Sequence, residues 1–187
     1  MTPRFADAMI LRPLDERPGE SSMSFEGNLD DNWAIGPKIH GGVMVALCAK
    51  AARQGYGIST AHPVAVSANF LSAPDPGPVR LITTVRKKGR RIGLVDVELV
   101  QGERACVHAV VTLGDPEHDA TPLFSGNPVV PVMAPEPPAD VLPIGPGHPA
   151  AEINHLARGC DIRPLVADTL LDGQAPAFQV WARPREG

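Results

Sequence analysis

The stretch WAIGPKIHGGVMVALCAKAARQGYG, residues 33–57, contains the feature from which the fold can be inferred. A His-Gly-Gly triplet leads directly into residues that are nearly all apolar or small. Polar side chains enter only near the end of this run, at Lys50 and Arg53, and the glycines Gly55 and Gly57 follow as helix stop signals. Because small residues lie on several of its faces, a sheet can approach this segment closely. Residues 43–52 are therefore predicted to form a buried central helix.

The sequence around this helix predicts an antiparallel sheet. Weak alternation indicates strands at residues 5–11 and 21–29. Stronger period-two alternation predicts four more strands, and the short links between them favour one antiparallel meander. These four strands are expected at residues 63–71, 79–88, 92–101 and 104–113. Residues 1–114 are therefore predicted to form an α+β domain in which a sheet wraps around one helix.

The character of the chain changes after this domain. Residues 115–149 contain ten of the 21 prolines, which predicts a linker with little regular structure. Beyond the linker, residues 151–165 and 175–184 are predicted to form two more strands. We expect three parts, with boundaries at 1–114, 115–149 and 150–187.

Composition excludes several classes of function. The chain has 187 residues and a net charge of −4, which argues against a nucleic-acid backbone or an anionic membrane as the main partner. Charged residues interrupt the first twenty positions, and no apolar run approaches the length of a membrane span. We expect a cytoplasmic protein whose partners are small molecules or proteins.

The cysteines and histidines predict neither a disulfide nor a metal site. Cys48, Cys106 and Cys160 are widely spaced and flanked by apolar or small residues, which is typical of reduced, buried thiols. The six histidines show no metal-ligand spacing with one another or with the cysteines.

The His-Gly-Gly triplet, which we call the HGG turn, is a candidate for binding or catalysis. It consists of His40, Gly41 and Gly42. Glycines in the first turn of a helix leave backbone N–H groups uncovered, and a helix N-terminus stabilises negative charge. Such groups suit a thioester carbonyl that gains oxyanion character during acyl transfer. The alternative is that the glycines only permit tight packing. His40 is a candidate for orienting the carbonyl or acting as a base, or else it caps the helix.

Several motifs resemble one known family when they are taken in order. WAIGPKIHGG, then HPVAVSANFLSAPDPGPV, then RKKGRR followed by a strand that ends in Gln101, resemble the TesB-like acyl-CoA thioesterases. Members of this thioesterase-like group carry two fused hotdog domains, and the match covers about residues 5–114. The later CDIRP and WARP resemble the opening strands of the second hotdog. The resemblance implies a hotdog fold, a curled antiparallel sheet around a long central helix, followed by an incomplete second hotdog.

The resemblance also implies an activity: binding of acyl-CoA thioesters and their hydrolysis to free acid and coenzyme A, with no cofactor beyond the coenzyme A of the substrate. Single-hotdog relatives of the HGG type carry Asp or Glu about two helical turns after the triplet, whereas residues 47–50 here read LCAK. In TesB-like proteins the acidic residue lies in the second hotdog, beyond the residues of this chain. A non-catalytic acyl-CoA binding or assembly module therefore remains an alternative.

Other residues are weaker candidates. Trp33 and Asn69 are predicted substrate contacts, and Cys48 is more simply a core thiol than a nucleophile. A hotdog hydratase would need Asp30, Asn32 and a nearby histidine, but His40 follows too late. The basic run can clamp the phosphates of coenzyme A or can form a solvated hairpin; its candidate residues are Arg86, Lys88, Arg90 and Arg91. Exposed sheet edges are expected to pair with a second copy of the chain.

Overall fold

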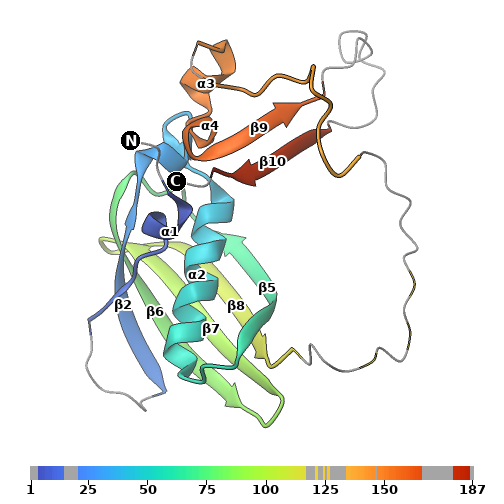
Figure 1. The fold of residues 1–187 in the computed structure, drawn as a ribbon. Helices are drawn as coiled ribbons and strands as arrows, with labels where there is room; N and C mark the ends of the chain where they lie inside the picture. The colour runs from blue at the N-terminus through green and yellow to red at the C-terminus, as the bar shows by residue number, and fades with distance from the viewer. Residues whose placement is uncertain are drawn as a thin grey trace.

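A six-stranded antiparallel sheet curls around one long helix, α2 (Gly41–Tyr56), in the computed structural model (Figure 1). The structure describes residues 4–14, 21–116, 121, 124, 126, 134–145, 147–165 and 179–185. The sheet and its central helix confirm the predicted α+β hotdog fold, while the incomplete second hotdog stays a prediction. The strands lie in the order β1-β2-β6-β7-β8-β5. Their bounds are β1 (Arg12–Pro13), β2 (Ser22–Leu29), β5 (His62–Phe70), β6 (Gly77–Lys88), β7 (Ile92–Gln101) and β8 (Arg104–Gly114).

The central helix is longer than predicted at both ends. Gly57 ends it in the left-handed conformation, with φ of 73°, and donates its N–H to the carbonyl of Arg53. Gly55, predicted as a stop signal, lies inside the helix. A Cβ at Gly55 would collide with the side chain of Thr83 on β6, so this glycine serves the close approach of helix and sheet.

The core lies between α2 and the concave face of the sheet. Leu47 and Ala51 of α2 are fully buried, and they meet a layer of aliphatic side chains with the period-two spacing of strands. The buried residues of this layer are Leu81, Val95, Val97, Leu99, Val107, Ala109, Val111 and Leu113.

Strand order corrects one prediction. The strands β6, β7 and β8 form the expected meander, but β5 pairs with β8 at the far side of the sheet rather than with β6. Residues 71–76 connect β5 to β6 and contain two prolines, so this link is not a tight hairpin turn and crosses between the two sides of the sheet. As a result β5 is an edge strand.

One other prediction of strand is wrong, and a second is wrong over its first part. Within residues 5–11 the chain forms the short helix α1 (Phe5–Ala8), since its two alanines favour a helical turn. Residues 151–165 hold most of α3 (Pro149–Ile153) and all of α4 (Leu156–Gly159) before β9 (Cys160–Pro164) begins. His148 caps α3, and Pro149 occupies its first position, where proline suits a helix. The last predicted strand is present as β10 (Val180–Pro184), while residues 175–178 lie outside the described part.

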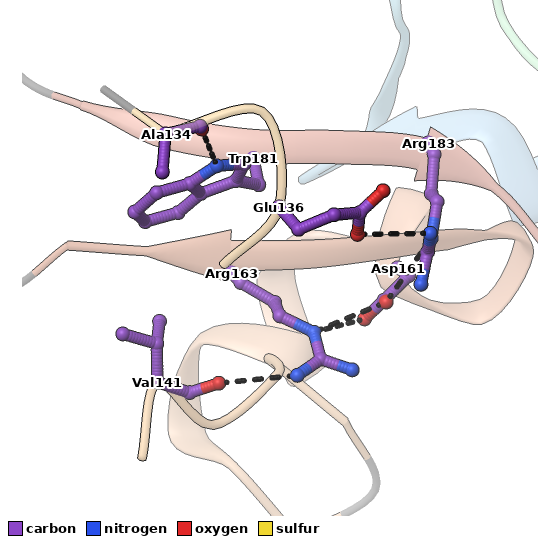
Figure 2. Close-up of polar contacts among 7 residues, drawn as sticks. All are labelled: Ala134, Glu136, Val141, Asp161, Arg163, Trp181 and Arg183. Carbon is purple, nitrogen blue, oxygen red and sulfur yellow. Dashed lines mark hydrogen bonds and ion pairs between the residues drawn. The ribbon is translucent and has the colours of Figure 1, made fainter. Parts of the chain in front are cut away.

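The proline-rich stretch is attached to the β9–β10 hairpin (Figure 2). Trp181 donates its indole N–H to the carbonyl of Ala134 at 2.8 Å. The carboxylate of Asp161 lies between the guanidinium groups of Arg163, at 3.1 Å, and Arg183, at 3.6 Å. Residues 134–145 of this stretch form no strand or helix. They are held on the hairpin by the Trp181 bond and by two arginines: Arg163 donates to the Val141 carbonyl at 3.3 Å, and Arg183 lies 3.5 Å from Glu136 Oε2. The boundaries at residues 114 and 149 stay predictions.

No helix among the described residues combines the length and the apolar character that crossing a bilayer requires.

Candidate functional site

His40 is the N-cap of α2. The side-chain Nδ1 of His40 accepts a hydrogen bond from the Gly42 backbone N–H at 3.2 Å. The backbone N–H of His40 donates to the carbonyl of Trp33 at 2.9 Å. Because Nδ1 accepts in this contact, the neutral imidazole carries its proton on Nε2. The capping role proposed for His40 is therefore present, and it engages one of the two glycine N–H groups of the HGG turn.

Gly41 is the glycine whose N–H stays available. Among the described residues this N–H has no hydrogen-bond acceptor. The ring of Phe70, at the end of β5, lies beside it: a Cβ at Gly41 would stand 2.9 Å from Phe70 Cζ. Both interpretations of the HGG turn, tight packing and an uncovered N–H, apply to Gly41. Its lack of a side chain permits close packing, and its N–H is a donor at the N-terminus of a 16-residue helix. Such a donor can bind the oxygen of a polarised carbonyl.

The link from β5 to β6 is attached to the same end of α2. Lys38 lies on β4 (Lys38–Ile39), two residues before His40, and its Nζ is 2.6 Å from Asp75 Oδ1. The Gln101 side chain accepts from the Asp75 N–H at 2.9 Å and donates to the Asp75 carbonyl at 2.8 Å. No sequence motif distinguishes Asp75, although the prolines on both sides of it mark an exposed turn.

The charge state of Asp75 limits its chemistry. The hydrogen bond from Lys38, followed by the charge of that ammonium group, lowers the pKa of Asp75 below its ordinary value. A carboxylate with a lowered pKa is a weaker proton acceptor than an ordinary one. Asp75 is therefore better suited to fastening the loop than to activating water.

The interior of α2 offers neither a carboxylate nor an ionised thiol. The helix contains no Asp or Glu between Gly41 and Tyr56. Burial raises the pKa of Cys48 to about 12, so its thiol stays protonated at neutral pH. The interpretation of Cys48 as a core thiol is confirmed. All three cysteines are free of disulfides.

The two predicted substrate contacts on other elements do not meet Gly41. Trp33 is 2% exposed, and its indole packs edge-on against Phe5 with ring centroids 5.4 Å apart. Its contacts are thus within the protein. Asn69 precedes Phe70 on β5, so it points to the opposite face of the sheet from the ring that touches Gly41. Ligand contacts by Trp33 and Asn69 stay predictions.

The basic turn between β6 and β7 lies at the other end of α2. Lys88 Nζ is 5.6 Å from the ring centroid of Tyr56, the last residue of the helix, and Arg86 is paired with Asp96 at 2.6 Å. A helix of 16 residues is about 24 Å long, so roughly that distance separates this turn from the HGG turn (Figure 1). Arg90 and Arg91 are exposed in the turn. A phosphate clamp formed by these residues stays a prediction.

The residues of the hydratase alternative have local structural roles. Asp30 Oδ1 accepts from the backbone N–H of Asn32 at 2.7 Å and from its side-chain amide at 2.8 Å. Asp30 thereby caps the short helix η1 (Asp31–Trp33), which precedes β3 (Ala34–Ile35). With His40 capping α2, these three residues form no common site.

Two surface hollows lie away from the HGG turn. One of 390 Å³ opens between α1 and the outer strands β1 and β2. Another, of 270 Å³, lies at the C-terminal end of α2 beside Lys50 and Arg53. Neither is lined by Gly41 or by Phe70. Phe70 is 55% exposed and Gly42 is exposed, so the described residues of the candidate site form a helix N-terminus that is open at the surface beside an edge strand.

Comparison with known proteins identifies the family to which the chain is similar. Residues 29–114 match the family model of the acyl-CoA thioesterase N-terminal domain. An uncharacterized protein of Mycobacterium tuberculosis, Rv0499, is 54% identical over 204 residues, which cover 99% of this chain and 70% of that protein.

Solved structures show the same fold. A conserved protein of unknown function with hot dog fold from Alicyclobacillus acidocaldarius aligns with a TM-score of 0.69 at 21% identity, over 96% of this chain and 62% of that chain. The PaaI protein of Escherichia coli, from the phenylacetic acid degradation operon, aligns with a TM-score of 0.51 at 20% identity, over 59% of this chain and 86% of that chain. The chain belongs to the thioesterase-like hotdog superfamily.

Proposed function

We propose that this protein binds an acyl-CoA thioester at the N-terminal end of α2 and hydrolyses it to the free acid and coenzyme A. The observation that carries the proposal is the Gly41 N–H, which has no acceptor among the described residues and lies at the start of a buried helix. The positive end of the helix dipole favours the negative charge that develops on a thioester oxygen. Membership of the thioesterase-like superfamily supports the same substrate class.

In this proposal the HGG turn binds and polarises the carbonyl. The Gly41 N–H donates to the carbonyl oxygen, while His40 fixes the turn by accepting from Gly42. Water adds to the carbonyl carbon, the carbon–sulfur bond breaks, and the departing thiolate takes up the proton that the water gives away. The base for that water lies outside α2, because the helix carries no carboxylate.

A non-catalytic acyl-CoA binding or assembly module is the second candidate. Two observations favour it: α2 has no Asp or Glu, and the pKa of Asp75 is lowered by Lys38. Both leave the carbonyl without an effective general base among these residues. Tight binding of a non-hydrolysable acyl-CoA thioether, together with no release of thiol from any thioester, would favour this candidate over the enzyme.

The partner that we propose for the sheet edge is a second copy of the chain. The edge strand β5 exposes 53% of Val64 and 55% of Phe70, and Leu71 just after it is 59% exposed. An unpaired edge with apolar side chains is a template for another strand. Because Phe70 touches Gly41, a partner at this edge would also shield the candidate site from water. A monomer in light scattering at high protein concentration would contradict this pairing.

Release of free thiol from acyl-CoAs of increasing chain length tests the proposal. We expect turnover in the wild type and a loss of at least about tenfold in kcat/KM for Gly41→Val, equivalent to about 1.4 kcal/mol of transition-state stabilisation. Gly145→Val is the matched control, since a Cβ there has its nearest neighbour at 4.0 Å. The absence of both turnover and binding for every chain length would overturn the proposal.

A further inference from the structure

Residues 149–159, which contain α3 and α4, form backbone hydrogen bonds with the stretch of chain that leads into His40. The Gly36 N–H donates to the carbonyl of Ile153 at 2.7 Å, and the His155 N–H donates to the carbonyl of Ala34 at 3.0 Å. These bonds add residues 153–155 to the free edge of β3 as a short antiparallel bridge. On its other edge β3 pairs with β4, which ends immediately before His40.

Side chains of the same segment hold η1. His155 Nδ1 lies 3.0 Å from the Asp31 carbonyl oxygen and 3.3 Å from Asp31 Oδ2. A carbonyl oxygen only accepts, so Nδ1 carries the proton and donates to Asp31. Arg158 donates to Asn32 Oδ1 at 3.3 Å and lies 3.8 Å from the Asp31 carboxylate. The His155 side chain is 17% exposed, which shields these contacts from competing water.

Trp33 joins these contacts to the HGG turn. Its indole packs so closely on Gly159 that a Cβ there would stand 2.5 Å from the ring. Its carbonyl accepts the N–H of His40 at 2.9 Å. One residue therefore touches both the α3–α4 segment and the cap of α2.

We propose that residues 149–159 are a positioning element for the HGG turn. They fix residues 31–39, and through Trp33 and β4 they set the position in which His40 caps Gly42 and leaves the Gly41 N–H available. None of them contacts the proposed substrate, so they act through His40. The positioning itself stands on the contacts above, whereas its effect on thioester binding rests on the proposed function.

Amide hydrogen exchange, measured by NMR, tests the positioning. His155→Leu removes the bonds to Asp31, and Gly159→Ala forces α4 away from Trp33. In each variant we expect the Gly42 amide, whose bond to His40 reports the cap, to exchange about tenfold faster, a factor that corresponds to about 1.4 kcal/mol. Exchange at Ala51, in the middle of α2, should not change.

The matched control is Arg183→Ala, which loosens the hairpin contacts to Glu136 and Asp161 without touching η1. The Gly42 amide should exchange at the wild-type rate in this control. His155→Leu retains the packing of Trp33 on Gly159, so it tests the idea even where Gly159→Ala disrupts folding. The proposal would be overturned if the amides of residues 153–155 exchange faster in His155→Leu than in the wild type while the Gly42 amide exchanges at the wild-type rate.

Binding of a non-hydrolysable acyl-CoA thioether that keeps its carbonyl, with a CH₂ group between the carbonyl and the sulfur, supplies a second measurement. We expect the dissociation constant to rise about tenfold in His155→Leu and to stay at the wild-type value in Arg183→Ala. A wild type that does not bind the thioether would contradict the proposed function, while the exchange experiment would still decide the positioning. A wild-type dissociation constant in His155→Leu would overturn the effect of positioning on ligand binding.

Discussion

The contact between Gly55 and Thr83 allows a quantitative test of how α2 meets the sheet. Gly55→Ala should gain roughly 0.8–1 kcal/mol from helix propensity. The added Cβ would overlap the Thr83 side chain, which is 1% exposed and donates to the Met23 carbonyl at 3.1 Å. Overpacking costs about 1–3 kcal/mol, and a weakened buried hydrogen bond adds about 1 kcal/mol. Steric cost therefore exceeds propensity, and we expect a net loss of about 1–3 kcal/mol.

Urea unfolding followed by circular dichroism measures this loss as a lower midpoint at unchanged slope. Combining Gly55→Ala with Thr83→Ala should recover part of the loss, because the two side chains share one space and their effects do not add. Gly55→Ala with wild-type or greater stability would refute the close approach of α2 and β6.

Further expectations follow from other residues of the helix and its cap. His40→Ala should destabilise the protein by about 1 kcal/mol in urea unfolding by removing the cap on the Gly42 N–H; unchanged stability would argue against the cap. Cys48 should resist iodoacetamide at pH 8 in the native protein and react after unfolding, because burial raises its pKa to about 12; rapid native labelling, mapped by mass spectrometry, would contradict its burial. Lys38→Met should raise the pKa of Asp75, as followed by NMR titration of its carboxyl carbon. Since the folded-state pKa of Asp75 is lowered, the stability that Lys38 contributes should be present above the unfolded-state pKa and vanish as pH falls through the folded-state pKa; a difference between the two proteins that persists at lower pH would refute the pairing.

The sequence was sufficient to predict the elements whose hydrophobic period is strong. Residues 92–101 were predicted as a strand and form β7 with the same bounds, and the apolar run after the HGG turn is the central helix. Periodicity carries no information on which strands become neighbours, so β5 was placed beside β6 rather than beside β8. The alternation in residues 5–11 relied on two alanines, which fit a helical turn equally well.

The candidate site was predictable in type but not in detail. The HGG turn indicated uncovered N–H groups, yet only the structure separates Gly41, whose N–H is available, from Gly42, whose N–H is bonded to His40. The link between Lys38 and Asp75 joins residues 37 positions apart, a separation at which no local pattern operates. The basic turn lies at the opposite end of α2 from the HGG turn. The length of the helix sets the distance between the two turns, and no motif in either turn predicts it.

The backbone amide signal of Gly41 tests directly whether this N–H binds the substrate carbonyl. It is followed in an NMR titration with a ketone analogue of an acyl-CoA, in which a CH₂ group between the sulfur and the carbonyl prevents hydrolysis. We expect a saturable downfield shift of the Gly41 amide proton as it donates to the ligand carbonyl, with little change at Ala51 in the middle of the same helix. Saturable binding that leaves the Gly41 amide unperturbed would contradict it.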